Sequence, residues 1–131
     1  MFQLFYLSNT KWQKTYDFLS EAGIPCVARN LRTQPFSYEE YLRILSLTQN
    51  GVEDILTVRG VVIDRLEKQG IHIEALSLRQ LYELLMTYPN LLKLPLLTDY
   101  NQFAVGLLGA KDLVERQGRL HKEGDVRVLL S

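Results

Sequence analysis

A chain of 131 residues is long enough to bury one core, and its 47% hydrophobic and 23% charged residues are typical of a folded globular protein, not a disordered one. Fifteen basic residues balance fifteen acidic ones, so net charge provides no general attraction to nucleic acid or to an anionic membrane. The one cysteine excludes an internal disulfide, and no apolar run approaches the roughly 20 residues of a membrane-spanning helix. We therefore expect a cytoplasmic, monomeric protein with one domain over residues 1–131.

The first thirty residues predict a strand–helix–strand unit. Residues 2–7 are almost continuously apolar, which is typical of a strand buried on both faces. Thr10 and Gln13 have the spacing of a capping box, so a helix is expected to begin there. Residues 26–31 predict a second strand, and a connection of this length implies a right-handed crossover between parallel strands.

Residues 36–90 predict an all-helical segment. Ser37 and Glu40 form one capping-box pair ahead of apolar residues at helical spacing, and Ser77 and Gln80 form a second pair. The sequence between these two helices favours one or two further helices. This segment contains no strand signal, so it is expected to interrupt the β-containing part of the chain.

The rest of the chain predicts a hairpin, a helix and a surface tail. Residues 94–98 and 102–106 read as strands on either side of Asp99-Tyr100-Asn101, a turn sequence. A helix is expected from about residue 108 to residue 117, and residues 118–131 are expected to form the tail. The predicted order is strand–helix–strand, helical insert, strand–strand–helix.

Short motifs in this order resemble the Spx/ArsC family, which comprises thioredoxin-like arsenate reductases and the related Spx transcription regulators. The residues that carry the resemblance are Tyr6, Ser8, Leu19, Ile24-Pro25, Arg29-Asn30, Gly51, Tyr82 in LYELL, Tyr88-Pro89, Pro95 and Val105-Gly106. The LYELL pattern and the Gly51 region are more similar to the Spx branch. The resemblance implies an α/β, thioredoxin-like (ArsC-type) mixed β-sheet, built from about 1–35 and 91–120, with an inserted all-helical subdomain over about 36–90.

The chain departs from the family at its cysteines. Counted back from Ile24-Pro25, the two cysteines of the Spx redox switch correspond to Asn9 and Trp12. An amide and an indole cannot form the covalent thiol adduct of a reductase. Asn9 either caps the helix or binds a phosphoryl group, and Trp12 either fills the vacated pocket or stacks on a ligand; the first role is favoured for each. Cys26 is either a reactive thiol or a packed strand residue, and packing is favoured.

The family's oxyanion arginines are also incomplete. Of the three arginines that hold the anion in arsenate reductases, Arg59 matches one, whereas the second position is Leu94, before Pro95, and the third falls near Val105. One arginine leaves most of the anion charge unpaired. The resemblance therefore implies a vestigial site with no catalytic residue and no cofactor. The two histidines lack partners at metal-ligand spacing, so no metal site is expected.

A partner-binding face is implied by the same resemblance. In Spx-like regulators the region with this glycine contacts the C-terminal domain of the RNA polymerase α subunit. Gly51 lets another backbone approach closely, and Glu53, Asp54 and Arg43 offer charges beside it. Arg59 either retains anion affinity or forms an ion pair with Glu53 or Asp54, and the ion pair is favoured.

Two classes of function remain open. The first is a non-enzymatic regulator that binds RNA polymerase without sensing oxidants through a CxxC disulfide, and without strong nucleic-acid or membrane binding of its own. The second is an ArsC-like oxidoreductase or oxyanion-binding enzyme that uses Cys26 or an external thiol. A degenerate paralogue with another protein partner is a further alternative. The missing nucleophile and arginines favour the regulator.

Overall fold

The structure is a computed structural model that describes residues 1–8, 10–57 and 61–116. Asn9, Arg59 and the predicted tail over 118–131 therefore lie outside the described residues. The described strands form one mixed sheet in the order β2-β1-β3-β4. Strand β1 (Phe2–Tyr6) runs parallel to β2 (Cys26–Asn30) and antiparallel to β3 (Leu96–Thr98), and β3 forms a hairpin with β4 (Phe103–Val105). The predicted parallel pair and the predicted hairpin are both confirmed.

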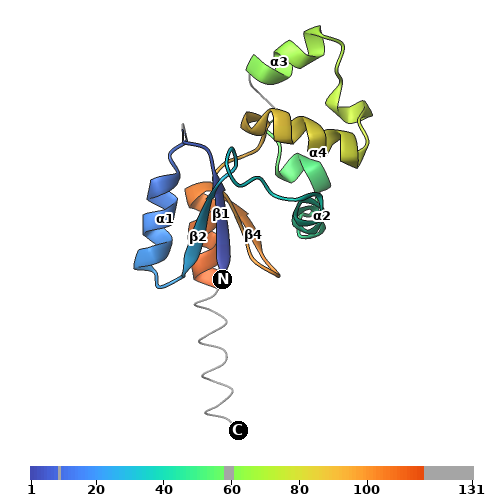
Figure 1. The fold of residues 1–131 in the computed structure, drawn as a ribbon. Coiled ribbons are helices and arrows are strands. Elements are labelled where there is room, and N and C mark those ends of the chain that lie inside the picture. The colour runs from blue at the N-terminus through green and yellow to red at the C-terminus, as the bar shows by residue number, and fades with distance from the viewer. Residues whose placement is uncertain (9, 58–60, 117–131) are drawn as a thin grey trace.

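The described helices fall into two groups: those that flank the strands in sequence, and those of the insert between β2 and β3. Helix α1 (Trp12–Glu21) connects β1 to β2, and a helix over residues 106–116 follows β4 two residues earlier than predicted. The elements between β2 and β3 are all helical: α2 (Tyr38–Ser46), η1 (Gly51–Asp54), α3 (Val61–Lys68), η2 (Ile73–Ala75), α4 (Leu78–Thr87) and η3 (Pro89–Leu91). Figure 1 shows α2, α3 and α4 gathered away from α1. None of the described helices is long and apolar enough to cross a membrane.

Strand β1 is buried on both faces, as its continuous apolar sequence predicts. Leu4 belongs to the core that α1 and the helix over 106–116 cover, together with Leu19 and Leu113. Phe5, on the opposite face, belongs to the core shared with the helical insert, together with Tyr41. The alternation of strand side chains thus directs one set of residues to each helical layer.

Both predicted capping boxes of the insert are present. The Ser37 hydroxyl accepts from the Glu40 backbone N–H at 3.1 Å, and the Glu40 carboxylate accepts from the Ser37 N–H at 2.9 Å. Ser77 and Gln80 make the same pair of bonds at the start of α4. Because these bonds satisfy amides that the helix leaves unpaired, they determine where each helix begins.

The predicted capping box at the start of α1 is wrong. The residue before the helix is Lys11, and no side chain caps this end. The Thr10 hydroxyl instead donates to the Leu7 carbonyl at 2.6 Å, which closes the turn after β1. Because Lys11 is the N-cap, Thr10 lies one residue before the position from which a side chain would complete the capping box.

Candidate functional site

The junction between β1 and α1, where the resemblance places a redox cysteine, is filled by aromatic packing. Trp12 stacks on Tyr6 with 4.0 Å between ring centroids and 22° between ring planes. Tyr16, one turn further along α1, meets the indole edge-on at 6.0 Å. All three rings are partly buried against the core beneath α1. The indole therefore occupies this junction as a packed side chain.

The segment before β3 lies at the same end of the sheet as the β1–α1 junction. The Leu94–Pro95 peptide bond is cis. Pro95 is buried, and its carbonyl accepts from the Gly106 N–H at 2.9 Å. Leu94 packs against the core of the insert. An apolar, packed side chain thus occupies the position to which the resemblance assigns an anion-binding arginine.

Cys26 lies at the other end of the strands. It pairs with Phe2 at the start of β2, whereas Tyr6 pairs with Asn30 four residues later. At about 3.3 Å per residue, roughly 13 Å of strand separates the thiol position from the β1–α1 junction. Burial raises the pKa of the Cys26 thiol, which is the opposite of the activation that a nucleophilic thiolate requires. Among the described residues there is also no cluster of three or more metal-ligating side chains.

The turn around Gly51 has a structural reason for its glycine. Gly51 has a φ of +68°, a conformation that side chains with a Cβ rarely adopt, although an added Cβ would meet nothing within 4 Å. The Asp54 carboxylate accepts from the backbone N–H groups of Gln49 and Asn50 at 2.9 and 3.0 Å. These bonds, with that from Asn50 the largest cause, lower the pKa of Asp54. The carboxylate therefore holds the turn that presents Glu53, which is exposed.

Arg43 faces a different part of the molecule. Its guanidinium lies 5.6 Å from the ring centre of Tyr100, a residue of the β3–β4 turn that is 77% exposed. Arg43 also lines a pocket of about 220 Å³ between α2, the sheet and this turn. Within the described part of the chain, no hydrogen bond or ion pair joins Arg43 to Gly51, Glu53 or Asp54. The predicted partner-binding residues thus form two groups, one at η1 and one at the hairpin.

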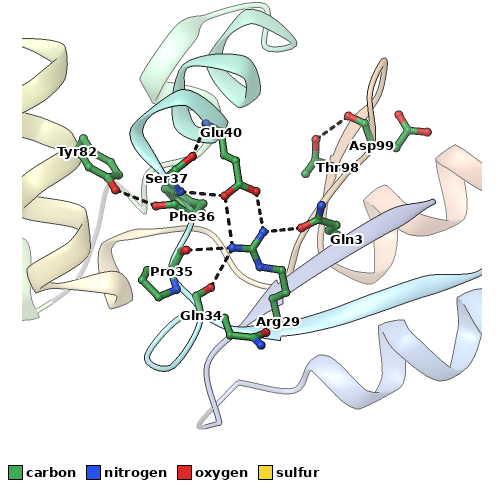
Figure 2. A network of polar contacts seen from close by, with 10 residues as sticks. All are labelled: Gln3, Arg29, Gln34, Pro35, Phe36, Ser37, Glu40, Tyr82, Thr98 and Asp99. Carbon is green, nitrogen blue, oxygen red and sulfur yellow. Dashed lines mark hydrogen bonds and ion pairs between the residues drawn. The ribbon is translucent and has the colours of Figure 1, made fainter.

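A polar network that the sequence did not predict joins the sheet to the insert (Figure 2). One nitrogen of the Arg29 guanidinium donates to Gln3 and to Glu40, both at 2.6 Å. The other donates to the carbonyls of Pro35 and Gln34 at 3.0 and 3.3 Å. Arg29 is therefore bonded at once to β1, to the loop after β2 and to the first turn of α2.

Glu40 takes part in this network and in the helix cap together. Burial alone raises its pKa, but the bonds from Arg29 and Ser37 outweigh burial and lower it. The hydroxyl of Tyr82, from α4, donates to the Phe36 carbonyl at 2.9 Å beside the same helix end. The sequence identified Glu40 as a capping residue and Tyr82 as a family landmark. Their long-range partners carry no local sequence signal, because they lie 11 and 46 residues away.

Known proteins resemble this chain in sequence and in fold. The family model described as "ArsC family" matches residues 6–111. Two proteins named "Global transcriptional regulator Spx" are each 33% identical to this chain over 99 residues, which is 76% of its length. One is from Streptococcus pneumoniae (strain ATCC BAA-255 / R6), of which the match covers 72%, and the other is from Bacillus subtilis (strain 168), of which it covers 73%. A putative arsenate reductase from Yersinia pestis superposes with a TM-score of 0.71 at 13% identity, covering 88% of this chain and 99% of that one. The arsenate reductase from Vibrio cholerae gives 0.67 at 19% identity, covering 87% and 95%. These likenesses confirm the thioredoxin-like, ArsC-type fold.

Proposed function

Because the chain belongs to the ArsC family, we propose that it is a transcriptional regulator of the Spx type that binds the C-terminal domain of the RNA polymerase α subunit and catalyses no reduction. The observation that carries the regulator assignment is the 33% identity to proteins named global transcriptional regulators. The reductase neighbours are below 20% identity, so they bear on the fold alone. A fold does not fix a function, and the site has to decide between the two classes.

The geometry of the described site favours a regulator over an oxidoreductase. Trp12, at one of the two positions to which the resemblance assigns a cysteine, is stacked on Tyr6, and the sequence has asparagine at the other. Cys26 is roughly 13 Å of strand away from that junction and its pKa is raised by burial. A nucleophilic cysteine of this family would lie at a helix N-terminus, which lowers the pKa of its thiol. Cys26 lies in a strand and has a raised pKa, so it lacks this activation.

The proposed contact with the α domain is the turn that η1 forms, with Gly51 and Glu53 at its surface. Glu53 is exposed, and among the described residues no cation forms an ion pair with its carboxylate. The turn therefore carries a surface carboxylate that could meet a basic group on a partner. Asp54 acts indirectly, because its carboxylate is bonded to the turn itself. Arg43 is proposed as a separate contact beside the hairpin.

The test is a calorimetric titration of the full chain with the isolated C-terminal domain of the α subunit. Glu53→Lys should weaken binding about tenfold and flatten its salt dependence, since it replaces an attractive charge with a repulsive one. Gly51→Arg should weaken binding further by placing a long cation on the contact surface. Binding that is absent for the wild type, or equal for all three proteins, would refute the proposed partner site.

Gly51→Arg needs a matched control because its backbone is left-handed. A residue with a Cβ at this φ costs about 1–2 kcal/mol whatever its side chain. Gly51→Ala carries the same strain without the cation, and Gly70→Arg places the same cation on another glycine with positive φ (+83°) and open space. Both controls should bind nearly as well as the wild type. Loss of binding in either control would assign the effect to strain or to general charge.

The absence of reductase chemistry has its own test. The purified protein should give no arsenate turnover with glutathione or glutaredoxin. Turnover that disappears in Cys26→Ser would overturn this part of the proposal and favour the oxidoreductase alternative.

A further inference from the structure

The helical insert contains a groove that neither the vestigial junction nor the Arg29 network uses. Residues of η1, α3, η2 and α4 enclose about 470 Å³, a volume in the range of protein binding sites. Buried Leu56 and Leu81 form its floor. Half-buried apolar residues line its walls: Val52, Ile63, Ile73 and Leu76. Leu78, which is 50% exposed, extends this apolar surface at the start of α4.

The rim of the groove is acidic. Exposed Glu53, Glu67 and Glu74 come from three different elements, and the described lining residues include no lysine or arginine. Neither of the two ion pairs within the described part of the chain uses any of the three carboxylates. Lys93 is near, but its hydrogen bond goes to the Glu53 backbone carbonyl, at 3.4 Å. The rim thus has three carboxylates that lack a partner cation among the described residues.

The basic residues of α3 do not offset this charge. At about 100° per residue, the groove-lining positions Ile63 and Glu67 lie on one face of the helix. On the same count, Arg65 lies about 180° and Lys68 about 120° from the middle of that face. The positive charges of α3 therefore lie away from the groove.

An occupant has to match both the apolar floor and the acidic rim. Nucleic acid is excluded because its phosphates would meet the carboxylates. A neutral or acidic helix would leave the carboxylates unpaired or repelled. A helix with leucine-like residues at i, i+3 and i+4, flanked by Lys or Arg, supplies apolar anchors to the floor and cations to the rim, as in other helix-in-groove complexes.

We propose that this groove binds a basic amphipathic helical segment of a partner protein. The site goes beyond the contact proposed for the α domain, with which it shares Val52 and Glu53 of η1. The two glutamates that the groove does not share, Glu67 and Glu74, separate one site from the other in an experiment.

The probe is a 15-residue synthetic peptide of leucine and lysine with leucine at the helical anchor positions, and its matched partner has glutamate in place of every lysine. Each is titrated into the ¹⁵N-labelled full chain while backbone amide shifts are recorded. The lysine peptide should shift the amides of Val52, Ile73 and Leu76 most, and the glutamate peptide should shift none of them. Equal binding of the two peptides, shifts centred elsewhere, or no binding below millimolar concentration would overturn the proposal.

Variants then test the rim. Glu67→Gln with Glu74→Gln should weaken the lysine peptide about tenfold at low salt and reduce its salt dependence. Asp17→Asn with Glu21→Gln, which removes two exposed carboxylates of α1, is the matched control and should change binding less than twofold. An equal loss of peptide binding in the control would mean that net charge, and not the rim carboxylates, causes the effect.

The α-domain titration distinguishes this inference from the proposed function. The Glu67→Gln/Glu74→Gln variant should bind the α domain as the wild type does. If it loses both ligands, the groove belongs to the α-domain interface and the separate site is refuted. A concentration-dependent dimer in sedimentation that the lysine peptide dissociates would assign the groove to a second copy and also refute the proposal.

Discussion

Replacing Arg29 with methionine should destabilise the protein by removing polar contacts that join the helical insert to the sheet. Methionine keeps most of the apolar stem that lies along the strand but removes all the donors of the guanidinium. The side chain of Arg29 is 18% exposed and that of Glu40 is 30% exposed, so their ion pair at 2.6 Å is partly shielded from water. Arg29→Met therefore leaves Glu40 and Gln3 without their donor at a half-buried junction.

The expected loss follows from the individual contacts. The charge-assisted bond to Glu40, discounted for its exposure, contributes about 1 kcal/mol, and the bond to Gln3 contributes about the same. The bonds to the Pro35 and Gln34 carbonyls, at 3.0 and 3.3 Å, contribute less than this each. The guanidinium also lies 4.8 Å from the Phe5 ring centre, a contact worth about 0.5 kcal/mol. Because such terms are not additive, we expect about 2–3 kcal/mol in all.

Urea denaturation at pH 7 measures this loss. A double-mutant cycle with Glu40→Gln should give a coupling of about 1 kcal/mol between the two residues. Because Arg29 lowers the folded-state pKa of Glu40, the pair stabilises the protein above the ordinary Glu pKa and the stabilisation is lost as pH falls through the folded value. The difference between wild type and Arg29→Met should therefore shrink below about pH 4. A coupling near zero, or a difference that grows on acidification, would refute this account.

Three further predictions concern single side chains. Tyr41→Phe should leave stability unchanged or raise it by up to about 1 kcal/mol, because the buried hydroxyl has no hydrogen-bond partner among the described residues. Burial also raises the pKa of Tyr41 to about 12. A loss above about 1 kcal/mol in urea denaturation would mean that the hydroxyl has a partner. Ser37→Ala should cost about 1 kcal/mol by thermal or urea denaturation, whereas Gln13→Ala should be neutral, since Ser37 caps α2 and no side chain caps α1. Cys26 should react with iodoacetamide at pH 7 more slowly than glutathione does, because its raised pKa leaves less thiolate; a faster reaction would contradict the packed role.

Local signals predicted the secondary structure well wherever the relevant bonds are also local. The boxes at Ser37 and Ser77 each join residues three apart, so the sequence alone identified both helix starts. The same pattern at Thr10 was misleading, because the helix begins one residue later than the pattern implies, with Lys11 as the N-cap. The residue at which this helix begins depends on the path of the chain after β1, which is a tertiary property.

The candidate site was predicted less completely. The sequence identified the absence of a thiol at the β1–α1 junction, but the stacking of Trp12 on Tyr6 required the strand and the helix to be placed together. Gly51 was interpreted as a partner contact, which stays a prediction, and its positive φ is a second, structural reason for glycine. Asp54 was interpreted in the same way, which also stays a prediction; the structure adds that its carboxylate bonds the preceding turn.

The sequence by itself determined the order of the elements, the two faces of β1, and the asparagine and tryptophan at the positions where the resemblance places cysteines, because each is a property of residue type or short-range spacing. Tertiary structure alone decided that Arg29 joins three segments, that Cys26 lies at the end of the sheet away from the β1–α1 junction, and that three glutamates border one groove. The physical reason is that these relations depend on strand register and helix packing. Side chains far apart in sequence meet only after the sheet and the insert have buried their shared core.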